Sequence, residues 1–171
     1  MYEEPSSPIC VRAAGSADTP EVIRLVAQVY WDMHAVYGGP EPLTDTQWED
    51  SVRDSLERRL GTDVGIFVVD GADGRLASVA VGRISDTLPS PRRSNVSEGC
   101  IEWVGTDPQS RGHGFANAVT RELLEWFRLR KAMSVSLYAS SAAESLYLRM
   151  GFDDGDGGPR ALSIRLKEDL A

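Results

Sequence analysis

A glycine-rich corner between an apolar run and a long helical pattern constrains the fold of this chain most strongly. Residues 100–106 (CIEWVGT) are typical of a strand, and residues 107–114 (DPQSRGHG) then bring two glycines close together. Directly after this corner, residues 115–130 repeat apolar side chains at helical spacing. A strand that passes straight into an amphipathic helix is a building unit of α/β domains, so the sequence predicts a mixed α/β sheet.

Two further helices are predicted upstream of the corner. The first spans 18–33, with a cap at 18–19 and apolar side chains at helical spacing. The second spans 44–61 and opens with a capping box from Thr44 to Gln47. Both carry one apolar face, which indicates that they pack against the sheet.

Alternating apolar residues predict the strands of the sheet, which are expected at 8–15, 64–70, 75–84, 100–106, 133–140 and 160–166. A polar loop, 85–99, follows the hairpin and is long enough to have a functional role. A short helix is predicted at 141–151, with a capping box from Ser141 to Glu144 and Gly151 as its stop.

Size and composition favour a single soluble domain. The chain has 171 residues, of which 42% are hydrophobic, and it contains no apolar run long enough to cross a membrane. The first ten residues are acidic and have no signal-peptide pattern, so we expect one cytoplasmic domain over 1–171.

The net charge of −8 argues against nucleic acid and anionic membranes as partners. It is consistent with a cationic small substrate, although solubility explains it equally well. Cys10 and Cys100 are expected to be buried free thiols. Together with His34 and His113 they lack the spacing of metal ligands, so no metal site is predicted.

The corner itself has the character of an anion site. A helix that starts after a glycine-rich turn presents free backbone N–H groups and the positive end of its dipole, which suits a phosphate or pyrophosphate. Gly112 and Gly114 allow close approach of the backbone, and Arg111 can add a charged contact. A tight turn of the sheet would need the same glycines, so the corner alone does not decide between the two.

Two segments together resemble the GCN5-related N-acetyltransferase (GNAT) superfamily. The first, IEWVGTDPQSRGHGFANAV, matches a family motif in which an apolar strand precedes Gln/Arg-x-x-Gly-x-Gly/Ala and a long helix. The second, ASSAAESLYLRMGF, matches Ala-x-x-Leu-Tyr-x-x-x-Gly-Phe; its matching residues are Ala143, Leu146, Tyr147, Gly151 and Phe152. The resemblance covers 64–166 well, and the N-terminal helices agree with it in kind.

The resemblance implies a fold, an activity and a co-substrate. The family fold is a largely antiparallel mixed sheet of about six to seven strands, splayed after the fourth strand, with about four helices. The activity is transfer of an acetyl group from acetyl-CoA to an amine. The cofactor-binding positions that the resemblance implies are Val104, Gly105, Thr106, Gln109, Arg111, Gly112, His113, Gly114, Phe115, Ala116, Ser140 and Tyr147. Thr106 and Ser140 depart from the usual valine and asparagine without changing the assignment.

Acetyl transfer from a thioester to an amine needs a neutral amine, a stabilised oxyanion and a proton for the leaving thiolate. The motif match makes Tyr147 the candidate acid, and a core tyrosine is the alternative. Glu102 is the candidate base, since a mid-strand carboxylate is unexpected on packing grounds. Alternation places it on the face of Val104 and opposite Trp103; the alternative is a rim glutamate held in an ion pair. A backbone N–H near Val104 is the expected oxyanion donor.

Residues 30–39 are rich in aromatic side chains, and in the family this region walls the acceptor pocket. The resemblance therefore implies four substrate contacts, Tyr30, Trp31, His34 and Tyr37. His113 is expected to act through its backbone rather than its ring. Residues 90–94 either close over the substrate or form a solvated loop.

Three functions are compatible with these features. The favoured one is N-acetylation of a primary amine of a small molecule by direct attack through a tetrahedral intermediate. The second is acetylation of a protein lysine or N-terminus, and the third is a catalytically silent acyl-CoA-binding regulator. The resemblance also leaves a homodimer open.

Overall fold

The strands that the structure describes form one sheet in the order in which they occur in the sequence. The computed structural model describes residues 8–44, 46–89, 91 and 97–153. Within them the sheet has five strands and the chain four α-helices, which confirms the mixed α/β fold. The elements are β1 (Arg12–Ala13), α1 (Thr19–Tyr37), α2 (Gln47–Arg59), β2 (Val64–Asp70), β3 (Leu76–Asp86), β4 (Ser97–Thr106), α3 (Phe115–Leu129), β5 (Ser134–Ser136) and α4 (Glu144–Arg149).

The sheet is antiparallel from β1 to β4 and opens beyond β4. β5 pairs with β4 in parallel, and only along Glu98–Cys100. From Ile101 to Thr106 no strand pairs with this edge of β4 in the described part of the chain. The predicted opening after the fourth strand is thus confirmed, and it leaves backbone groups of β4 free to pair with another molecule.

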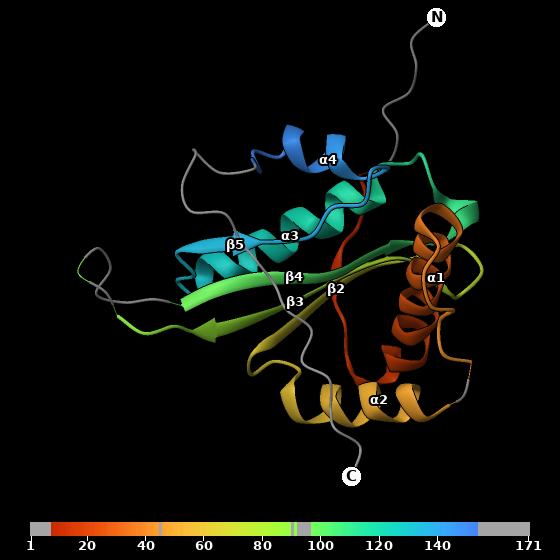
Figure 1. Ribbon diagram of the computed structural model, residues 1–171, viewed down its shortest axis with the longest axis horizontal. Coiled ribbons are helices and arrows are strands. Elements are labelled where there is room, and N and C mark those ends of the chain that lie inside the picture. Colours follow the sequence, from red (N-terminus) through yellow and green to blue (C-terminus); the bar gives the residue numbers. More distant parts are fainter. Residues whose placement is uncertain (1–7, 45, 90, 92–96, 154–171) are drawn as a thin grey trace, which may run out of the picture. The chain divides into compact units, whose positions relative to one another are not determined.

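Helices cover both faces of the sheet (Figure 1). α1 and α2 pack on one face, where Val22, Val26 and Leu56 meet Val79 and Val81 in a buried cluster. α3 packs on the other face through residues that lie four apart, Val119, Leu123 and Phe127, all of them at most 1% exposed. These three are the predicted apolar face of the helix; the fourth member, Phe115, is half-buried at the corner.

The chain divides into two compact units between Tyr138 and Ala139. The first unit holds the five described strands with α1, α2 and α3, and the second holds α4. α4 ends as predicted at Gly151, whose φ is +96°. The N–H groups of Phe152 and Gly151 bond to the carbonyls of Tyr147 and Leu148 at 3.0 and 3.1 Å, which is a Schellman motif. The rings of Tyr147 and Phe152 lie edge to face, 5.8 Å apart.

Several local predictions are corrected by the structure. The strand expected at 8–15 is reduced to the two residues of β1. Both helices start later than predicted: Gln47 and Glu144 are the first helical residues rather than the third ones, and the N-cap residues are Thr46 and Ala143. The N–H of Glu144 bonds to the carbonyl of Ser140.

The connection between β3 and β4 is shorter than the predicted loop 85–99. Ser85 pairs with Glu98 and Asp86 with Ser97, so both ends of the predicted loop belong to the ladder. The segment 90–94 and the strand expected at 160–166 lie outside the described residues, apart from Pro91.

The structure also tests the expected burial of the two cysteines and the expected absence of a membrane span. Cys10 is exposed and Cys100 is half-buried, so neither is the buried thiol that was expected. Along the described residues, no helix is long and apolar enough to cross a membrane.

Candidate active site

The glycine-rich corner is held in place by charged contacts to α1. Asp107 directly follows β4, and its carboxylate accepts hydrogen bonds from the N–H of Gln109 at 3.1 Å and from Nη1 of Arg24 at 2.7 Å. The bond from Gln109, and then the one from Arg24, hold the pKa of Asp107 below its usual value. Arg24 also binds Glu21 and the carbonyl of Leu76. This network fixes the corner to the first turns of α1.

The two glycines of the corner adopt a conformation that other residues avoid. Gly112 and Gly114 both have φ of +81°, and Gly114 directly precedes the first residue of α3. Among the described residues, no group accepts a hydrogen bond from the N–H groups of 115–117. The corner therefore combines free donors, the positive end of a helix of 15 residues and a backbone that a ligand can approach closely.

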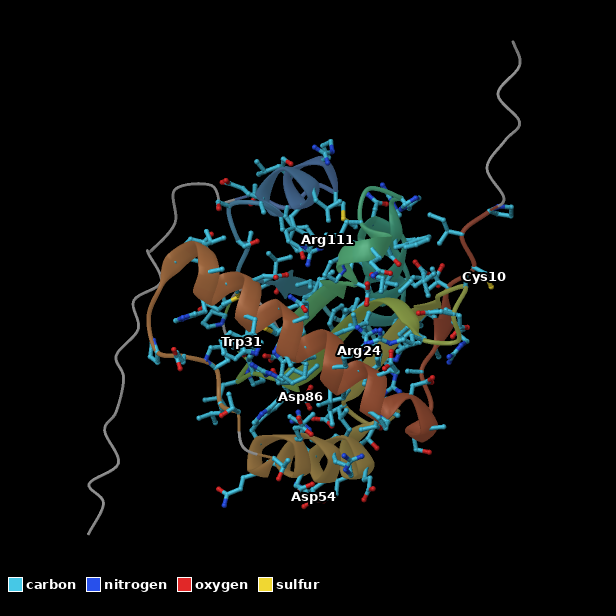
Figure 2. The ribbon with its side chains drawn as sticks, turned by 90° about the vertical axis from the view of Figure 1, so that its right-hand side faces the viewer. Cys10, Arg24, Trp31, Asp54, Asp86 and Arg111 are labelled. Carbon is cyan, nitrogen blue, oxygen red and sulfur yellow. The ribbon has the colours of Figure 1, made fainter. Side chains whose placement is uncertain are left out.

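Two side chains of the corner, those of His113 and Arg111, have defined contacts. His113 contacts the carbonyl of Ser110 through Nδ1 at 3.2 Å, and its ring stacks on Phe115 at 5.7 Å. Nη2 of Arg111 donates to Oδ2 of Asp32 on α1 at 2.6 Å, and its Nε donates to the carbonyl of Thr106 at 3.3 Å. Figure 2 shows Arg111 together with Arg24 and Trp31 on the side of the molecule where α1 lies.

The last residues of β4 link the corner to the open edge of the sheet. The hydroxyl of Ser78 bonds to the carbonyl of Gly105 and to the hydroxyl of Thr106, both at 2.9 Å. Thr106, which departs from the family's usual valine, thus has a buried polar partner on β3. A Cβ at Gly105 would lie 3.0 Å from Cγ2 of Val29, so α1 packs directly on the backbone of β4 here.

A bulge changes the predicted orientation of Glu102. Val81 pairs with Trp103 and Gly82 with Ile101, so Glu102 is an extra residue in β4. Its carboxylate accepts a hydrogen bond from Nε of Arg83. Arg83 lies two residues after Val81 on β3, and it therefore shares the face of Val81, which α1 and α2 cover. Glu102 therefore shares a face with Trp103, and the prediction from simple alternation was wrong.

Glu102 belongs to a mixed charge cluster on this face. Arg83 is its direct partner. On α2, the pKa of Arg59 is raised mainly by its hydrogen bond to Asp63 and, to a smaller extent, by the charge of Glu102. Arg59 in turn binds Asp63 at 2.6 Å. Burial first, and then the charge of Glu102, raise the pKa of the thiol of Cys100. The candidate base is thus a fixed carboxylate surrounded by compensating charges.

The aromatic residues from 30 to 37 form the last turns of α1, which extends beyond the predicted end at residue 33 and leads into a loop after Gly38. α1 ends at Gly38, whose φ is +68° and whose N–H bonds to the carbonyl of His34 at 2.8 Å. Tyr30, Trp31 and Tyr37 are exposed on its last two turns. Trp31 meets His34 edge to face at 6.0 Å, and Nδ1 of His34 is buried with no hydrogen bond within the described residues.

The second unit carries Ser140 and Tyr147. Ser140 precedes α4 and accepts hydrogen bonds through its carbonyl from Ala143 and Glu144, both at 2.9 Å. Tyr147 is 7% exposed. This burial raises the pKa of Tyr147 to about 12, so the phenol keeps its proton throughout the physiological range.

Within the first unit, the structure brings together most of the predicted cofactor residues. Val104, Gly105 and Thr106 run along the open edge directly into the corner, and Arg111 folds back onto Thr106. Sequence reasoning missed three polar partners: Ser78, Arg83 and Asp32. Each contacts its partner from at least 19 residues away, and no local pattern signals such a contact.

Comparison with protein families assigns the chain that carries this site to a family. The sequence model of the Acetyltransferase (GNAT) family matches residues 26–152, which span β4, the corner and α4. The chain belongs to the GNAT family. It is accordingly an acetyltransferase, and acetyl-CoA is its co-substrate.

Solved structures with the same fold include several GNAT proteins. A predicted acetyltransferase from Clostridium acetobutylicum, solved with acetyl-CoA, has a TM-score of 0.74 at 20% identity, covering 91% of this chain and 96% of that one. A GCN5-related N-acetyltransferase from Ralstonia eutropha has a TM-score of 0.72 at 21% identity, with coverages of 91% and 99%. Glucosamine-6-phosphate N-acetyltransferase from Arabidopsis thaliana has a TM-score of 0.67 at 18% identity, with coverages of 95% and 100%.

Proposed function

We propose that this GNAT protein acetylates a primary amine of a small molecule by direct attack of the amine on the thioester of acetyl-CoA. The observation that carries the proposal is the open edge of β4, which runs into a corner with free N–H donors. In the reaction the amine nitrogen bonds to the acetyl carbon, the carbon–sulfur bond breaks, and one proton leaves the nitrogen while the thiolate takes one up.

The corner and the edge fit the two polar parts of the co-substrate. We assign the pyrophosphate to the backbone N–H groups of 111–116, because free donors at a helix start favour anions and both glycines leave room for close approach. The amide-bearing pantetheine arm is assigned to the edge at Val104, Gly105 and Thr106, and we assign further contacts to Gln109, Ser140 and Tyr147. A backbone N–H near Val104 is the proposed oxyanion donor.

Glu102 is the proposed general base. Its partner Arg83 keeps the carboxylate in one position, which favours proton transfer through a defined water or directly from the amine. The same ion pair is what a purely structural glutamate would show. The pH dependence of Glu102→Gln distinguishes the two roles.

Tyr147 is the proposed acid for the leaving thiolate. Its assignment rests on the motif in which it lies and on its own protonation, because a pKa of about 12 keeps the phenol protonated at every working pH. Donation from such a weak acid to a thiolate is a hydrogen bond that strengthens as sulfur gains charge, rather than an early proton transfer.

The acceptor is assigned to the exposed end of α1. Tyr30, Trp31, His34 and Tyr37 are the proposed contacts, and the buried, unbonded Nδ1 of His34 marks a polar group that a ligand can satisfy. The net charge of −8 supports a cationic small molecule over a protein surface. A structural neighbour named for an amino-sugar acceptor provides one precedent.

The extent of the domain, the cellular location and the oligomeric state are predictions. The family match from 26 to 152 spans both compact units, which supports one acetyltransferase domain over 1–171. A cytoplasmic location and a homodimer, which many members of the family form, are further predictions.

The decisive experiment is release of free thiol from acetyl-CoA in the presence of a panel of amines. The panel should contain aminoglycosides, polyamines, amino acids, lysine peptides and peptides with free N-termini. Release with a small amine supports the proposal. Release with peptides alone would favour a protein acetyltransferase, and CoA binding without any release would favour the silent regulator.

A further inference from the structure

Arg111 lies between the proposed cofactor site and α1, and it binds a partner on each side. Its guanidinium binds Asp32 through Nη2 at 2.6 Å, while Nε bonds to the carbonyl of Thr106 at 3.3 Å. Thr106 belongs to the edge assigned to the pantetheine arm, and the backbone of Arg111 belongs to the corner assigned to the pyrophosphate. In this conformation the guanidinium occupies the carbonyl of Thr106, which is assigned to the pantetheine arm of the co-substrate.

The contact between Arg111 and Asp32 is suited to exchange. The two side chains are 50% and 43% exposed, and ion pairs this open to water contribute little to stability. A guanidinium bound to phosphate oxygens forms stronger, bidentate, charge-assisted bonds. When a pyrophosphate occupies the neighbouring N–H groups, the guanidinium gains by turning toward it and leaving Asp32.

Loss of Arg111 leaves Asp32 with an unmatched charge. Its Oδ1 still accepts a hydrogen bond from Nε2 of Gln28 at 2.8 Å, which holds the side chain in place, but Oδ2 loses its cation. Asp32 follows Trp31 directly on α1, beside the proposed acceptor contacts. A carboxylate positioned to bind one cation, and then deprived of it, is a site for another cation.

We propose that Asp32 binds an ammonium group of the acceptor, and that Arg111 occupies Asp32 until the pyrophosphate of acetyl-CoA draws the guanidinium away. The inference rests on the proposed cofactor site and deepens it, since it names the acceptor as a cationic amine that binds after the co-substrate. Neither residue acts on the reacting atoms; Asp32 binds the acceptor and Arg111 controls access to Asp32.

The first test is calorimetric titration with CoA, which needs no acceptor. Asp32→Asn releases Arg111, so CoA should bind about two- to fivefold more tightly, the range that an exposed ion pair supports. In an Arg111→Gln background the same substitution should have no effect. Glu125→Gln removes one negative charge from an exposed ion pair on α3 and controls for the change in net charge.

The second test uses spermidine as a cationic amine probe. We expect spermidine to bind the CoA-loaded wild type at least fivefold more tightly than the free protein, and Asp32→Asn to abolish this difference. A wild type that does not bind CoA would refute the proposed cofactor site. If CoA binds, the inference alone fails when Asp32→Asn binds CoA no more tightly than Glu125→Gln does, or when spermidine binds equally with and without CoA.

Discussion

Glu102 and Arg83 form an ion pair at the point where the pairing of β3 and β4 is interrupted by a bulge. The bulge inserts Glu102 as an extra residue and turns its carboxylate to the face of the sheet that α1 and α2 cover. Bulges commonly re-aim one side chain beside a functional site. This one lies two residues before the start of the edge assigned to acetyl-CoA, so a base there would be close to the thioester.

Glu102→Gln tests this role through its dependence on pH. An amine acceptor is mostly protonated at neutral pH, and the base is needed most under those conditions. We expect the loss in kcat/KM to be largest near pH 7 and to shrink as pH approaches the pKa of the acceptor. Thiol release between about pH 6.5 and 9.5 measures this directly.

The matched control for this experiment is Glu125→Gln, which also neutralises an arginine-bound glutamate but lies on α3. It should leave the pH profile unchanged. A deficit of constant size across the pH range in Glu102→Gln would identify Glu102 as a structural partner of Arg83. The proton would then leave through solvent or through a carboxylate of residues 85–99, and Asp86 and Glu98, which lie in the ladder between β3 and β4, would be tested next.

Gly114→Asp tests the anion site. The substitution places a negative side chain at the start of α3, where the co-substrate's pyrophosphate is expected. We expect the affinity for acetyl-CoA to fall at least about tenfold, or about 1.4 kcal/mol. Gly114→Asn is the matched control, because asparagine has the same shape and tolerates the φ of +81° without adding charge. Equal affinities of the two variants would argue against a phosphate at this position.

Tyr147→Phe removes one hydroxyl and keeps the ring that contacts Phe152. If Tyr147 donates to the thiolate, kcat should fall roughly 10²–10⁴-fold while the affinity for acetyl-CoA barely changes. Tyr138→Phe, at a residue that is 97% exposed, should behave like the wild type. Activity within about threefold of the wild type would leave Tyr147 as a packing residue only.

The same variant makes a prediction about stability at alkaline pH. Tyr147 has a pKa of about 12 in the folded chain, above the ordinary value of 10, so the folded state holds its proton more tightly. The resulting stabilisation is complete below pH 10 and is lost as pH rises toward 12. From pH 9 to 11 the wild type should lose about 1.4 kcal/mol more of its unfolding free energy than Tyr147→Phe does. Urea unfolding at each pH measures the difference, and identical losses would contradict it.

Local sequence patterns predicted the elements of this fold well and their contacts poorly. β2 was predicted residue for residue at 64–70, because a short apolar run followed directly by a turn leaves little choice. The start of α3 at Phe115 was predicted for a similar reason, since the glycines before it favour a turn over a helix. The extension of α1 to Tyr37 was missed, because its final turns carry exposed side chains and thus no core pattern.

The local geometry around the candidate site was predicted where it depends on the backbone of one segment, and it was missed where it depends on pairing between segments. The corner at 109–116 is a local motif, so its residues could be named in advance. The bulge at Glu102 depends on how β4 aligns with β3, and nothing within either strand marks it. The bond from Arg111 to Asp32 joins residues 79 positions apart, which only the folded chain brings together.

The packing of α3 on the sheet requires a glycine at position 82. A Cβ there would lie 2.6 Å from Cζ of Phe127 and 3.0 Å from both methyl carbons of Leu123, and neither side chain has room to move. Gly82→Ala should therefore destabilise the chain by about 1–3 kcal/mol in chemical unfolding, the usual cost of overpacking.

Gly15→Ala is the control for this last prediction, because a Cβ at Gly15 meets no atom within 4 Å and its φ is not positive. It should change stability far less. Phe127→Leu removes the closest ring atom, so combining it with Gly82→Ala should cost less than the sum of the two single substitutions. Strict additivity would mean that α3 shifts away from the sheet as a whole, and that Gly82 does not set its distance from β3.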